Sequence, residues 1–397
     1  MVPKGRFVLM GRAAISRIMD SPEPLDGLKA EIRTQVPLER LIPFDAEHSA
    51  EGHMFLGRSR FLTRLIDEET ASFAVAGPSR IGKTSLLKRH HVELVKAKAP
   101  SQFSHHYIDL MRCGSKDDDE IARFIVNTID SSHKNHRLTA ERIELALAAL
   151  KERFDAPVGL LLDEVDEYVG SDAFRYLSQA AKKDYCRLVL GGKGTLLKKM
   201  LEENNPFQCR VHLLRLEPLD DDEAVRLLFS PIRDMGFEIR EPNKVRDSFF
   251  RWTGRLPHLI QFYGHRLCEM MIDKPRTALD INLIETLRDS LETFTYFSDP
   301  LFKAKDPTLR FIALIMVDLE HRPHRLEQID ERLRAKGLTL TIDVLWEKLN
   351  ELVILNVLAW SRGAFQVANE SLIYYARETS FMTPGLCMGT RLGAPVW

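Results

Sequence analysis

The spacing of apolar residues changes along the chain, and these changes predict its elements. Five short apolar runs are expected to be β-strands, at 73–76, 105–110, 157–164, 187–192 and 209–216. Between most of them the sequence repeats apolar residues every three or four positions, which is typical of helices. Strands that are apolar on both sides and alternate with helices indicate a parallel sheet covered on both faces. The pattern therefore predicts an α/β fold for the first half of the chain.

The second half has a different pattern, because the strand signals stop near residue 219. Four helical segments follow, then two prolines, and then three more helical segments with two short strands around Ser361–Gly363. Three helices and a hairpin are typical of a winged helix. The expected units are an irregular segment with at most one short helix at 1–50, an α/β domain at 51–217, a helical lid subdomain at 218–297, a winged-helix domain at 298–379 and a flexible tail at 380–397.

Composition narrows the class of protein. The chain has 397 residues and a formal net charge of −1, which gives no bulk attraction to nucleic acid or to anionic membranes. No apolar run is long enough to span a bilayer. The five cysteines include no CxxC pair, which argues against zinc and disulfide frameworks and fits a reducing compartment. The first 19 residues carry four basic side chains and no acid, as in a transit peptide or an arbitrary start. We expect a cytoplasmic protein without a membrane partner.

The sequence GPSRIGKT, residues 77–84, fits the pattern of a phosphate-binding loop. Gly77 and Gly82 allow the backbone to curl with its N–H groups inward, and the helix that follows points its positive end at the phosphates. Lys83 is expected to contact the β and γ phosphates, and the Thr84 hydroxyl to bind Mg²⁺. The predicted nucleotide contacts in this loop are Gly77, Pro78, Ser79, Arg80, Ile81, Gly82, Lys83, Thr84 and Ser85.

Two acids end the third apolar run and supply the second part of the site. Asp163 is expected to hold Mg²⁺ through water, and Glu164 to polarise the water that attacks the phosphate. Asp166 and Glu167 are expected to be solvated loop acids. Lys193, after the next strand, is either a sensor of the γ-phosphate or an ordinary solvent-facing lysine.

Whether the nucleotide carries adenine or guanine is predicted from a motif that the chain lacks. A GTPase reads guanine with N-K-x-D after a strand, and the nearest sequence, NKVRD at 243–247, has one residue too many and falls on a predicted helix. Its absence favours ATP. A small-molecule kinase is an alternative, but it would need neither a winged helix nor a long helical lid.

An ordered series of motifs resembles the STAND-type ATPases and the related archaeal-type AAA ATPases, over about residues 54 to 378. The series is FLGRSRFL, GPSRIGKTSLL, HHYIDL, LLLDE, RLVLGG, LEPLDDDEAVRLL and WTGRLPHLIQ. The resemblance implies that Gly57 and Arg58 lie beside the nucleotide and that Pro257 of the lid packs near the adenine. It also implies that nucleotide exchange and hydrolysis move the lid and the winged helix.

The chain departs from the family pattern at two places. The lid signature usually reads Gly-Gly-x-Pro, and here Arg255 stands where the second glycine would be. Apoptotic and plant-immunity members carry Met-His-Asp after the wing, with the histidine touching phosphate. The corresponding stretch here is Val367-Ala368-Asn369, so a direct contact of the winged helix with the nucleotide is not implied.

Three functions are consistent with these features. The first is an ATP-binding, slowly hydrolysing switch whose target is another protein or its own copies. The second is a DNA-associated ATPase similar to origin-recognition proteins, and the third is a nucleotide-binding scaffold in which Glu164 is idle. In residues 301–380, eleven acids balance four lysines and seven arginines. A helix that reads the major groove should be basic, whereas the third helix here is acidic, which favours the switch.

Overall fold

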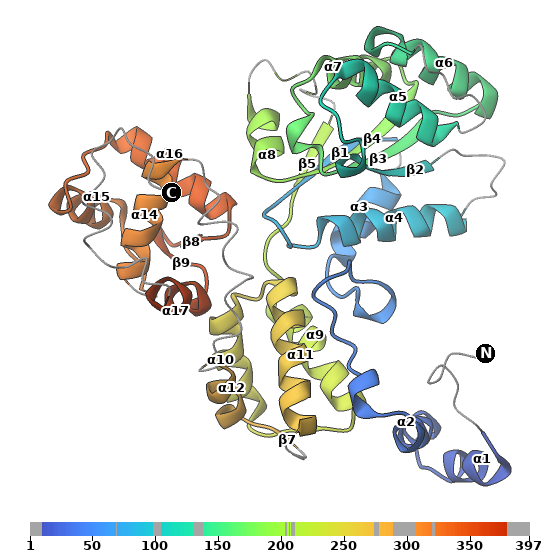
Figure 1. Ribbon diagram of the computed structural model, residues 1–397, viewed down its shortest axis with the longest axis vertical. Coiled ribbons are helices and arrows are strands. Elements are labelled where there is room, and N and C mark those ends of the chain that lie inside the picture. The colour runs from blue at the N-terminus through green and yellow to red at the C-terminus, as the bar shows by residue number, and fades with distance from the viewer. Residues whose placement is uncertain are drawn as a thin grey trace.

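The computed structural model describes residues 10–68, 70–97, 105–130, 138–202, 205, 207, 211–273, 278–288, 306–319 and 322–378. The predicted tail at 380–397 and nearly all of the predicted linker lie outside these residues. A core with a parallel sheet, a helical lid and a C-terminal domain surround a central gap between ribbons (Figure 1). Two N-terminal helices project from the side of the lid opposite the C-terminal domain.

The core contains one five-stranded sheet, and the α/β prediction is confirmed. All neighbours in the order β2-β3-β4-β1-β5 are parallel. The strands are β1 (Ser72–Ala76), β2 (His105–Asp109), β3 (Val158–Asp163), β4 (Cys186–Gly192) and β5 (Val211–Arg215). This order places β4 between β1 and β3, so the ends of these three strands meet at one edge of the sheet.

Helices cover both faces of this sheet, as the apolar runs predict (Figure 1). On one face Ala74, Leu160 and Leu188 pack with helices that follow β2, β3 and β4, and on the other Phe73 and Leu161 pack with helices around the phosphate loop. The first group is α5 (Asp118–Ile129), α6 (Ile143–Phe154), α7 (Asp172–Lys182) and α8 (Gly194–Leu201), and the second is α3 (Ser59–Asp67) and α4 (Lys83–Ala97). Short 3-10 helices occur at Leu38–Arg40, Gly52–Met54, Leu110–Arg112, Ala140–Arg142 and Val165–Glu167.

The lid contains the four predicted helices and one strand pair that the sequence did not indicate. The helices are α9 (Asp221–Asp234), α10 (Pro242–Thr253), α11 (Pro257–Asp273) and α12 (Ile281–Arg288). A capping box between Asp220 and Glu223 starts α9, since each residue's side chain accepts from the other's backbone N–H. The extra pair, β6 (Glu238–Ile239) with β7 (Ala278–Leu279), is parallel and two residues long, which is too short for a periodic signal.

The C-terminal domain has the helices and hairpin of a winged helix. They are α14 (Pro307–Asp318), α15 (Leu326–Ala335), α16 (Ile342–Ile354), the antiparallel pair β8 (Leu358–Ser361) and β9 (Ala364–Val367), and a final helix α17 (Glu370–Glu378). The apolar core of this domain is continuous with that of the lid. Trp252 of α10 packs edge-on against Tyr374 of α17, with ring centroids 5.6 Å apart.

The N-terminal segment differs from the irregular lead-in that the sequence predicts. It forms two helices, α1 (Arg12–Met19) and α2 (Pro24–Gln35). Pro24 is the first residue of α2, where a proline loses no helical hydrogen bond. Gly27 allows the two helices to cross, because a Cβ there would lie 2.9 Å from that of Ser21. The prolines and glycines that suggested breaks are therefore parts of a helical pair.

Candidate nucleotide-binding site

The phosphate loop connects β1 to α4, as the sequence predicts. Arg80 and Gly82 have φ values of 64° and 102°, so the chain uses the left-handed region twice within three residues. Gly77 is tightly enclosed, because a Cβ there would lie 3.1 Å from the carbonyl oxygen of Leu216. The loop therefore curls against the end of the sheet, with α4 beginning at Lys83.

Lys83 is held inside the loop. Its Nζ donates to the carbonyl oxygens of Gly77 at 3.0 Å and Pro78 at 2.8 Å, and only 4% of the residue is exposed. Burial lowers the pKa of Lys83 to about 8, and the nearby carboxylate of Glu164 partly opposes this shift. A desolvated ammonium group with fixed orientation is suited to an incoming anion, because water competes weakly for it.

Asp163 lies at the end of β3 and contacts the loop directly. It accepts hydrogen bonds from the Thr84 hydroxyl and, at 2.9 Å, from the Tyr107 hydroxyl of β2. Burial raises the pKa of Asp163 and these hydrogen bonds oppose the rise. Gly191 of β4 makes room for this carboxylate, since a Cβ at that position would lie 2.7 Å from its Oδ1. No pattern in the sequence predicted this contact of Tyr107.

A hydroxyl beside a carboxylate at the foot of the phosphate loop is a donor set that fits Mg²⁺. Thr84 and Asp163 are the residues that would hold it, together with phosphate oxygens of the nucleotide. Among the described residues no group of three or more histidines, cysteines and acids could hold a metal ion by itself. The Thr84–Asp163 donor set fits a metal whose remaining ligands are phosphate oxygens of a nucleotide.

Glu164 forms an ion pair with Lys193, the residue that follows β4. Lys193 Nζ lies 3.0 Å from Glu164 Oε2. The two residues meet because β3 and β4 are adjacent and parallel, so their carboxyl ends lie side by side. Glu164 has a φ of 56°, a left-handed conformation that is uncommon outside glycine and that often occurs at functional sites.

The two acids after Glu164 have different surroundings, although the sequence suggested that both are solvated. Asp166 accepts from the backbone N–H groups of Lys193 at 2.7 Å and Leu196 at 3.1 Å. It therefore caps the start of α8 and connects the β3 loop to the end of β4. Glu167 is exposed and pairs with Lys116 at 2.7 Å.

Arg58 supports the phosphate loop from the N-terminal side. Its Nη2 donates to the carbonyl oxygen of Ile81 at 3.0 Å, and burial lowers its pKa to about 10. The preceding Gly57 has a φ of 73°, and a Cβ there would lie 2.6 Å from Leu219. This glycine lets the segment pass close to the start of the lid, which places Arg58 at the nucleotide cavity.

A cavity of about 510 Å³ lies over the phosphate loop. Its walls include Arg58, Glu164, Leu227 of α9, Pro257 of α11 and loop residues 80–85. Thus most of the predicted contacts lie together, whereas Gly77, Pro78, Ser79 and Asp163 are not among its lining residues.

Residues 45–50 also line the cavity, and the sequence did not predict this role for them. The Ala50 N–H donates to Ser85 Oγ at 3.0 Å, and Lys88 Nζ donates to Ser49 Oγ at 2.9 Å. At the other end the Asp45 N–H donates to Gln261 Oε1 at 3.1 Å. We call this segment the strap, because it joins α4 of the core to α11 of the lid. In the sequence, only the turn-forming Asp45 at its start indicates a defined structure in this segment.

A second bond joins the phosphate loop to the lid. Arg80 Nη1 lies 2.8 Å from Nε2 of His258, the second residue of α11. Burial, aided by the Arg80 charge, lowers the pKa of His258 to about 3, so the ring is neutral at pH 7. A guanidinium group has no acceptor, so Arg80 donates and the imidazole accepts. Pro257 and His258 thus connect the start of the lid helix to the loop.

The two departures from the family pattern have clear structural consequences. Arg255 has a φ of 57°, the conformation that a glycine would adopt freely. Asn369 is buried and its Oδ1 accepts from Ser371 Oγ at 2.6 Å and from the Leu372 N–H at 3.0 Å. It caps α17, and neither it nor Ala368 lines the nucleotide cavity.

Solved structures with a similar fold are found at low sequence identity. A Walker-type ATPase of Pyrococcus abyssi matches with a TM-score of 0.63 and 15% identity, over 84% of this chain and 99% of the other. The ORC2 protein of Aeropyrum pernix gives 0.48 and 16%, over 81% and 92%. The RuvB branch migration motor of Thermotoga maritima gives 0.42 and 15%, over 79% and 92%. No curated protein matches the sequence.

A match to a protein-family model identifies the family. The model described as Novel STAND NTPase 1 matches residues 37–375, a range that includes the strap, the phosphate loop, the lid and nearly all of the described C-terminal domain. The resemblance drawn from the ordered motifs is thereby confirmed. The chain belongs to the novel STAND NTPase 1 family and is a P-loop NTPase.

Proposed function

We propose that this protein is an ATP-dependent switch that hydrolyses ATP slowly and passes its nucleotide state to a protein partner. The observation that carries the proposal is the bond between Arg80 and His258. It ties the loop that would hold the phosphates to the first turn of α11 in the lid. A nucleotide held by this loop with the bond intact favours the closed lid, so its binding changes the free energy of lid closure, which is the requirement for a switch.

The chemistry follows from the residues around the phosphate loop. A water molecule attacks the γ-phosphorus of ATP, its proton passes to Glu164, and the bond to the β–γ bridging oxygen breaks to give ADP and phosphate. Lys83 neutralises the charge that develops on the phosphates. When bound, Mg²⁺ supplies further charge neutralisation to the same oxygens. Because Lys193 pairs with Glu164, the base is free only after this ion pair opens, which is consistent with slow turnover.

The C-terminal domain is positioned to follow the nucleotide state, since it contacts both other parts. Ile354 of α16 lies close to the core, because a Cβ on Gly194 of α8 would be 3.5 Å from its Cγ2. Lys198 of α8 lies 3.9 Å from Glu351 of α16. On the lid side Arg288 pairs with Glu370 at 3.2 Å. Since α8 starts beside Lys193, a change at Glu164 reaches the C-terminal domain through one helix.

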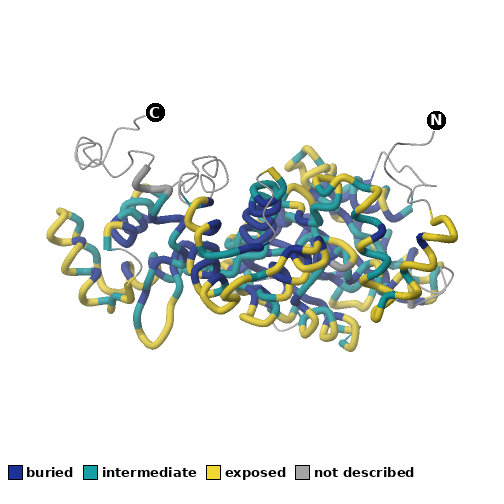
Figure 2. Tube along the Cα trace, turned by 90° about the horizontal axis from the view of Figure 1, so that it is seen from below, coloured by how far each residue is buried: buried dark blue, intermediate teal, exposed yellow. Residues whose placement is uncertain are grey.

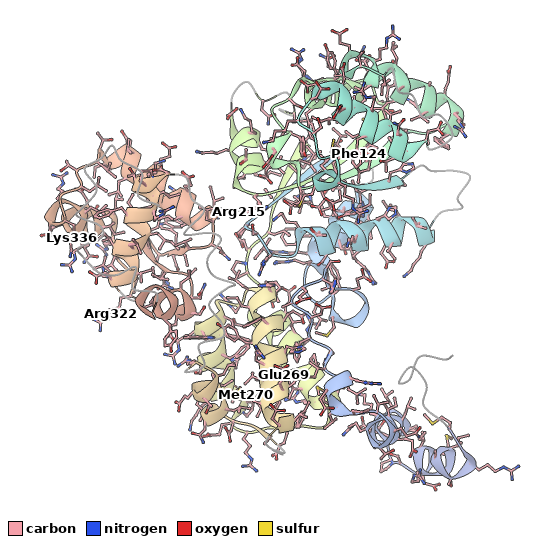
Figure 3. The ribbon with its side chains drawn as sticks, in the orientation of Figure 1. Phe124, Arg215, Glu269, Met270, Arg322 and Lys336 are labelled. Carbon is pink, nitrogen blue, oxygen red and sulfur yellow. The ribbon has the colours of Figure 1, made fainter. Side chains whose placement is uncertain are left out.

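These contacts favour a protein partner over duplex DNA. The helix that would read the major groove, α16, has its C-terminal end against the core and exposes Asp343 and Glu347. Lys336 and Arg322 lie on the outer side of the domain, away from the core (Figure 3). Binding of DNA through α16 would therefore require this domain to leave the core and acids to face phosphate.

Hydrolysis is tested with Glu164→Gln beside Glu167→Gln, an exposed acid of the same loop. We expect Glu164→Gln to retain ATP binding and to lose about 100-fold or more of the phosphate release rate, because the base is removed. Glu167→Gln should turn over like the wild type. Phosphate release by Glu164→Gln at the wild-type rate would exclude Glu164 as the base.

Switching and DNA binding are tested with the same protein. Hydrogen exchange of α8, α11 and α17 is compared with ADP, with a non-hydrolysable ATP analogue and with no nucleotide. We expect protection to differ between the two nucleotides in α11 and α17. Identical exchange in all states would contradict the switch and favour the scaffold.

A gel-shift titration with duplex DNA should show no complex, and DNA-stimulated hydrolysis would favour the DNA-associated alternative.

A further inference from the structure

Tyr107 is a side chain of the candidate site to which the proposed hydrolysis assigns no role. Its hydroxyl donates to Asp163 Oδ2 at 2.9 Å. Tyr107 lies in β2, at the edge of the sheet, and Asp163 is the last residue of β3. A long side chain therefore connects the edge strand to the carboxylate that, with Thr84, would hold Mg²⁺.

The register of the sheet explains why a tyrosine reaches this carboxylate. Tyr107 is directly opposite Leu161, and Asp109 is opposite Asp163. Because side chains alternate along a strand, Tyr107 lies on the same face of the sheet as Leu161 and Asp163. Two residues along a strand span about 6.6 Å, a distance that the ring and hydroxyl of tyrosine bridge. A serine or threonine at this position would end before the carboxylate.

The ring of Tyr107 is also held from the side of α4. Thr84 and Lys88 are four residues apart, so they lie on one face of this helix. The Thr84 hydroxyl donates to Asp163, and Lys88 Nζ lies 5.9 Å from the centroid of the Tyr107 ring. Lys88 is itself fixed, since it donates to Ser49 of the strap at 2.9 Å. The helix that begins at the phosphate loop thus contacts both the carboxylate and the ring beside it.

The two oxygens of Asp163 are held separately. Oδ1 accepts from the backbone N–H of Glu164 at 3.0 Å, and Oδ2 accepts from Tyr107. β3 is buried over its whole length, as are the other segments that lie inside the molecule in Figure 2, and only 1% of Asp163 is exposed. Water therefore replaces a lost partner poorly. Because rotation about the Cβ–Cγ bond would break both hydrogen bonds, Tyr107 fixes the plane of the carboxylate and the direction of its remaining lone pairs.

We propose that Tyr107 is a positioning residue for Mg²⁺, because it holds Asp163 in the orientation that the metal requires. The inference rests on the nucleotide site proposed above and adds a residue to it. Loss of a hydrogen-bond partner of a metal-binding side chain typically weakens metal binding by about 10- to 100-fold. Tyr107 does not line the nucleotide cavity, so its effect on ATP should depend entirely on the metal.

Titration calorimetry of the full chain with a non-hydrolysable ATP analogue, in Mg²⁺ and in EDTA, tests this role. The ratio of the two affinities measures the contribution of the metal. We expect Tyr107→Phe to lower this ratio by about tenfold. The affinity in EDTA should equal that of the wild type, because the variant removes one oxygen atom and no cavity residue, and this binding also shows that the variant is folded.

Tyr168→Phe is the matched control. The Tyr168 hydroxyl also lies in the core, where it donates to the backbone carbonyl oxygen of Leu110 at 3.1 Å. Each variant loses one hydrogen bond of a tyrosine, so both should melt at a lower temperature than the wild type. A purely structural Tyr107 would behave like Tyr168, with a lower melting temperature and an unchanged ratio of affinities, and that result would contradict the proposal.

A double-variant cycle identifies the residue through which Tyr107 acts. Asp163→Asn should remove most of the gain from Mg²⁺, because a neutral amide attracts a divalent cation less than a carboxylate does. Tyr107→Phe added to Asp163→Asn should then change nothing further. Additive losses would show that Tyr107 acts on another group.

Mn²⁺ in place of Mg²⁺ provides a direct measure of the bound metal. With the analogue bound, the electron paramagnetic resonance signal of free Mn²⁺ shows how much metal the complex holds, and half-saturation should require about ten times more Mn²⁺ in Tyr107→Phe than in the wild type. A wild type that binds the analogue equally well with and without metal would overturn the metal site and the proposal with it. A clear gain from metal in the wild type, with the same or a larger gain in Tyr107→Phe, would overturn the role of Tyr107 alone.

Discussion

Two cavities of this molecule differ in how far their charged side chains are buried. The nucleotide cavity, of about 510 Å³, contains Lys83, of which only 4% is exposed, and Arg58, 5% exposed, lies where this cavity meets the second one. A second cavity, of about 1170 Å³, lies between the core, the lid and the C-terminal domain. In the second cavity Arg255 pairs with Asp221 at 2.6 Å, and 42% and 70% of the two side chains remain exposed. Arg215 lies at the side of the core toward the C-terminal domain (Figure 3).

This difference in burial distinguishes a cavity suited to binding a charged ligand from a cavity that lies between domains. A buried cation has already lost its hydration, and oriented carbonyl oxygens hold it, so an anionic ligand gains the full interaction. Exposed ion pairs are screened by water and salt and contribute little to stability. We therefore expect substitutions in the first cavity to change ligand binding, and those in the second to change stability or the position of the domains.

The largest effect is expected for Lys83→Ala. The variant removes a charge-assisted contact to phosphate from a desolvated site, which is worth about 3 kcal/mol or roughly 100-fold in ATP affinity. Isothermal titration with ATP measures this loss. Lys96→Ala, at an exposed lysine of the same helix, is the control and should bind normally. An unchanged ATP affinity in Lys83→Ala would contradict the assignment of the phosphate loop.

The pH dependence of ATP binding is the next largest effect. Because burial lowers the pKa of Lys83 to about 8, its charge is complete well below pH 8 and is lost as the pH rises above that value. ATP needs the charged form, so its affinity should fall by about tenfold per pH unit above pH 8. A titration series from pH 7 to pH 9 measures the slope. An affinity that stays constant to pH 9 would show that Lys83 does not titrate in this range.

The sequence predicted the core better than the connections between parts. A short unbroken apolar run such as PVGLLLDE, between helical patterns, is typical of a buried parallel strand. A glycine-rich loop between such a strand and a helix is a local motif, so both could be predicted locally. The strap at 45–50 and the contact from Arg80 to His258 join segments about 35 and 178 residues apart. No local periodicity reports such a contact, because it depends on how the lid folds back over the core.

Local signals were also misinterpreted where one residue type has two uses. The prolines and glycines of the N-terminal segment suggested breaks, but Pro24 starts a helix and Gly27 lets two helices cross. Asp166 suggested a solvated acid, but it caps α8. In both cases the side chain is compatible with either role, and the packing partner decides which one is realised.

A smaller effect is expected at the connection between the loop and the lid. Arg80→Ala and His258→Ala should each lower ATP affinity by about fivefold, because one hydrogen bond to a charged group is lost where the lid covers the cavity. The double variant should be no worse than either single one, since both remove the same bond. Titration calorimetry of the three variants measures the coupling. Arg60→Ala, an exposed neighbour of Arg58, is the control, and additive losses in the double variant would show that the bond does not connect the two elements.

The smallest effect is expected at Arg255, beside the second cavity. Arg255→Gly relieves a left-handed backbone, with a φ of 57°, and gains about 1 kcal/mol. The loss of the exposed pair with Asp221 costs about 0.5 kcal/mol, and the extra freedom of glycine in the unfolded chain costs a similar amount. These contributions nearly cancel, so the apparent melting temperature should stay within about 2 °C of the wild type, with ATP affinity unchanged.

Gly254→Ala, one residue earlier, sharpens the contrast at the same cavity. Gly254 has a φ of 59°, and a Cβ there would lie 2.8 Å from the carbonyl oxygen of Ala368. Alanine therefore adds backbone strain and pushes the lid away from the C-terminal domain. Its melting temperature should fall by several degrees more than that of Arg255→Gly, because a collision with backbone cannot relax by side-chain rotation. If both variants melt like the wild type, the C-terminal domain is not held against the lid in solution, and the second cavity is open there.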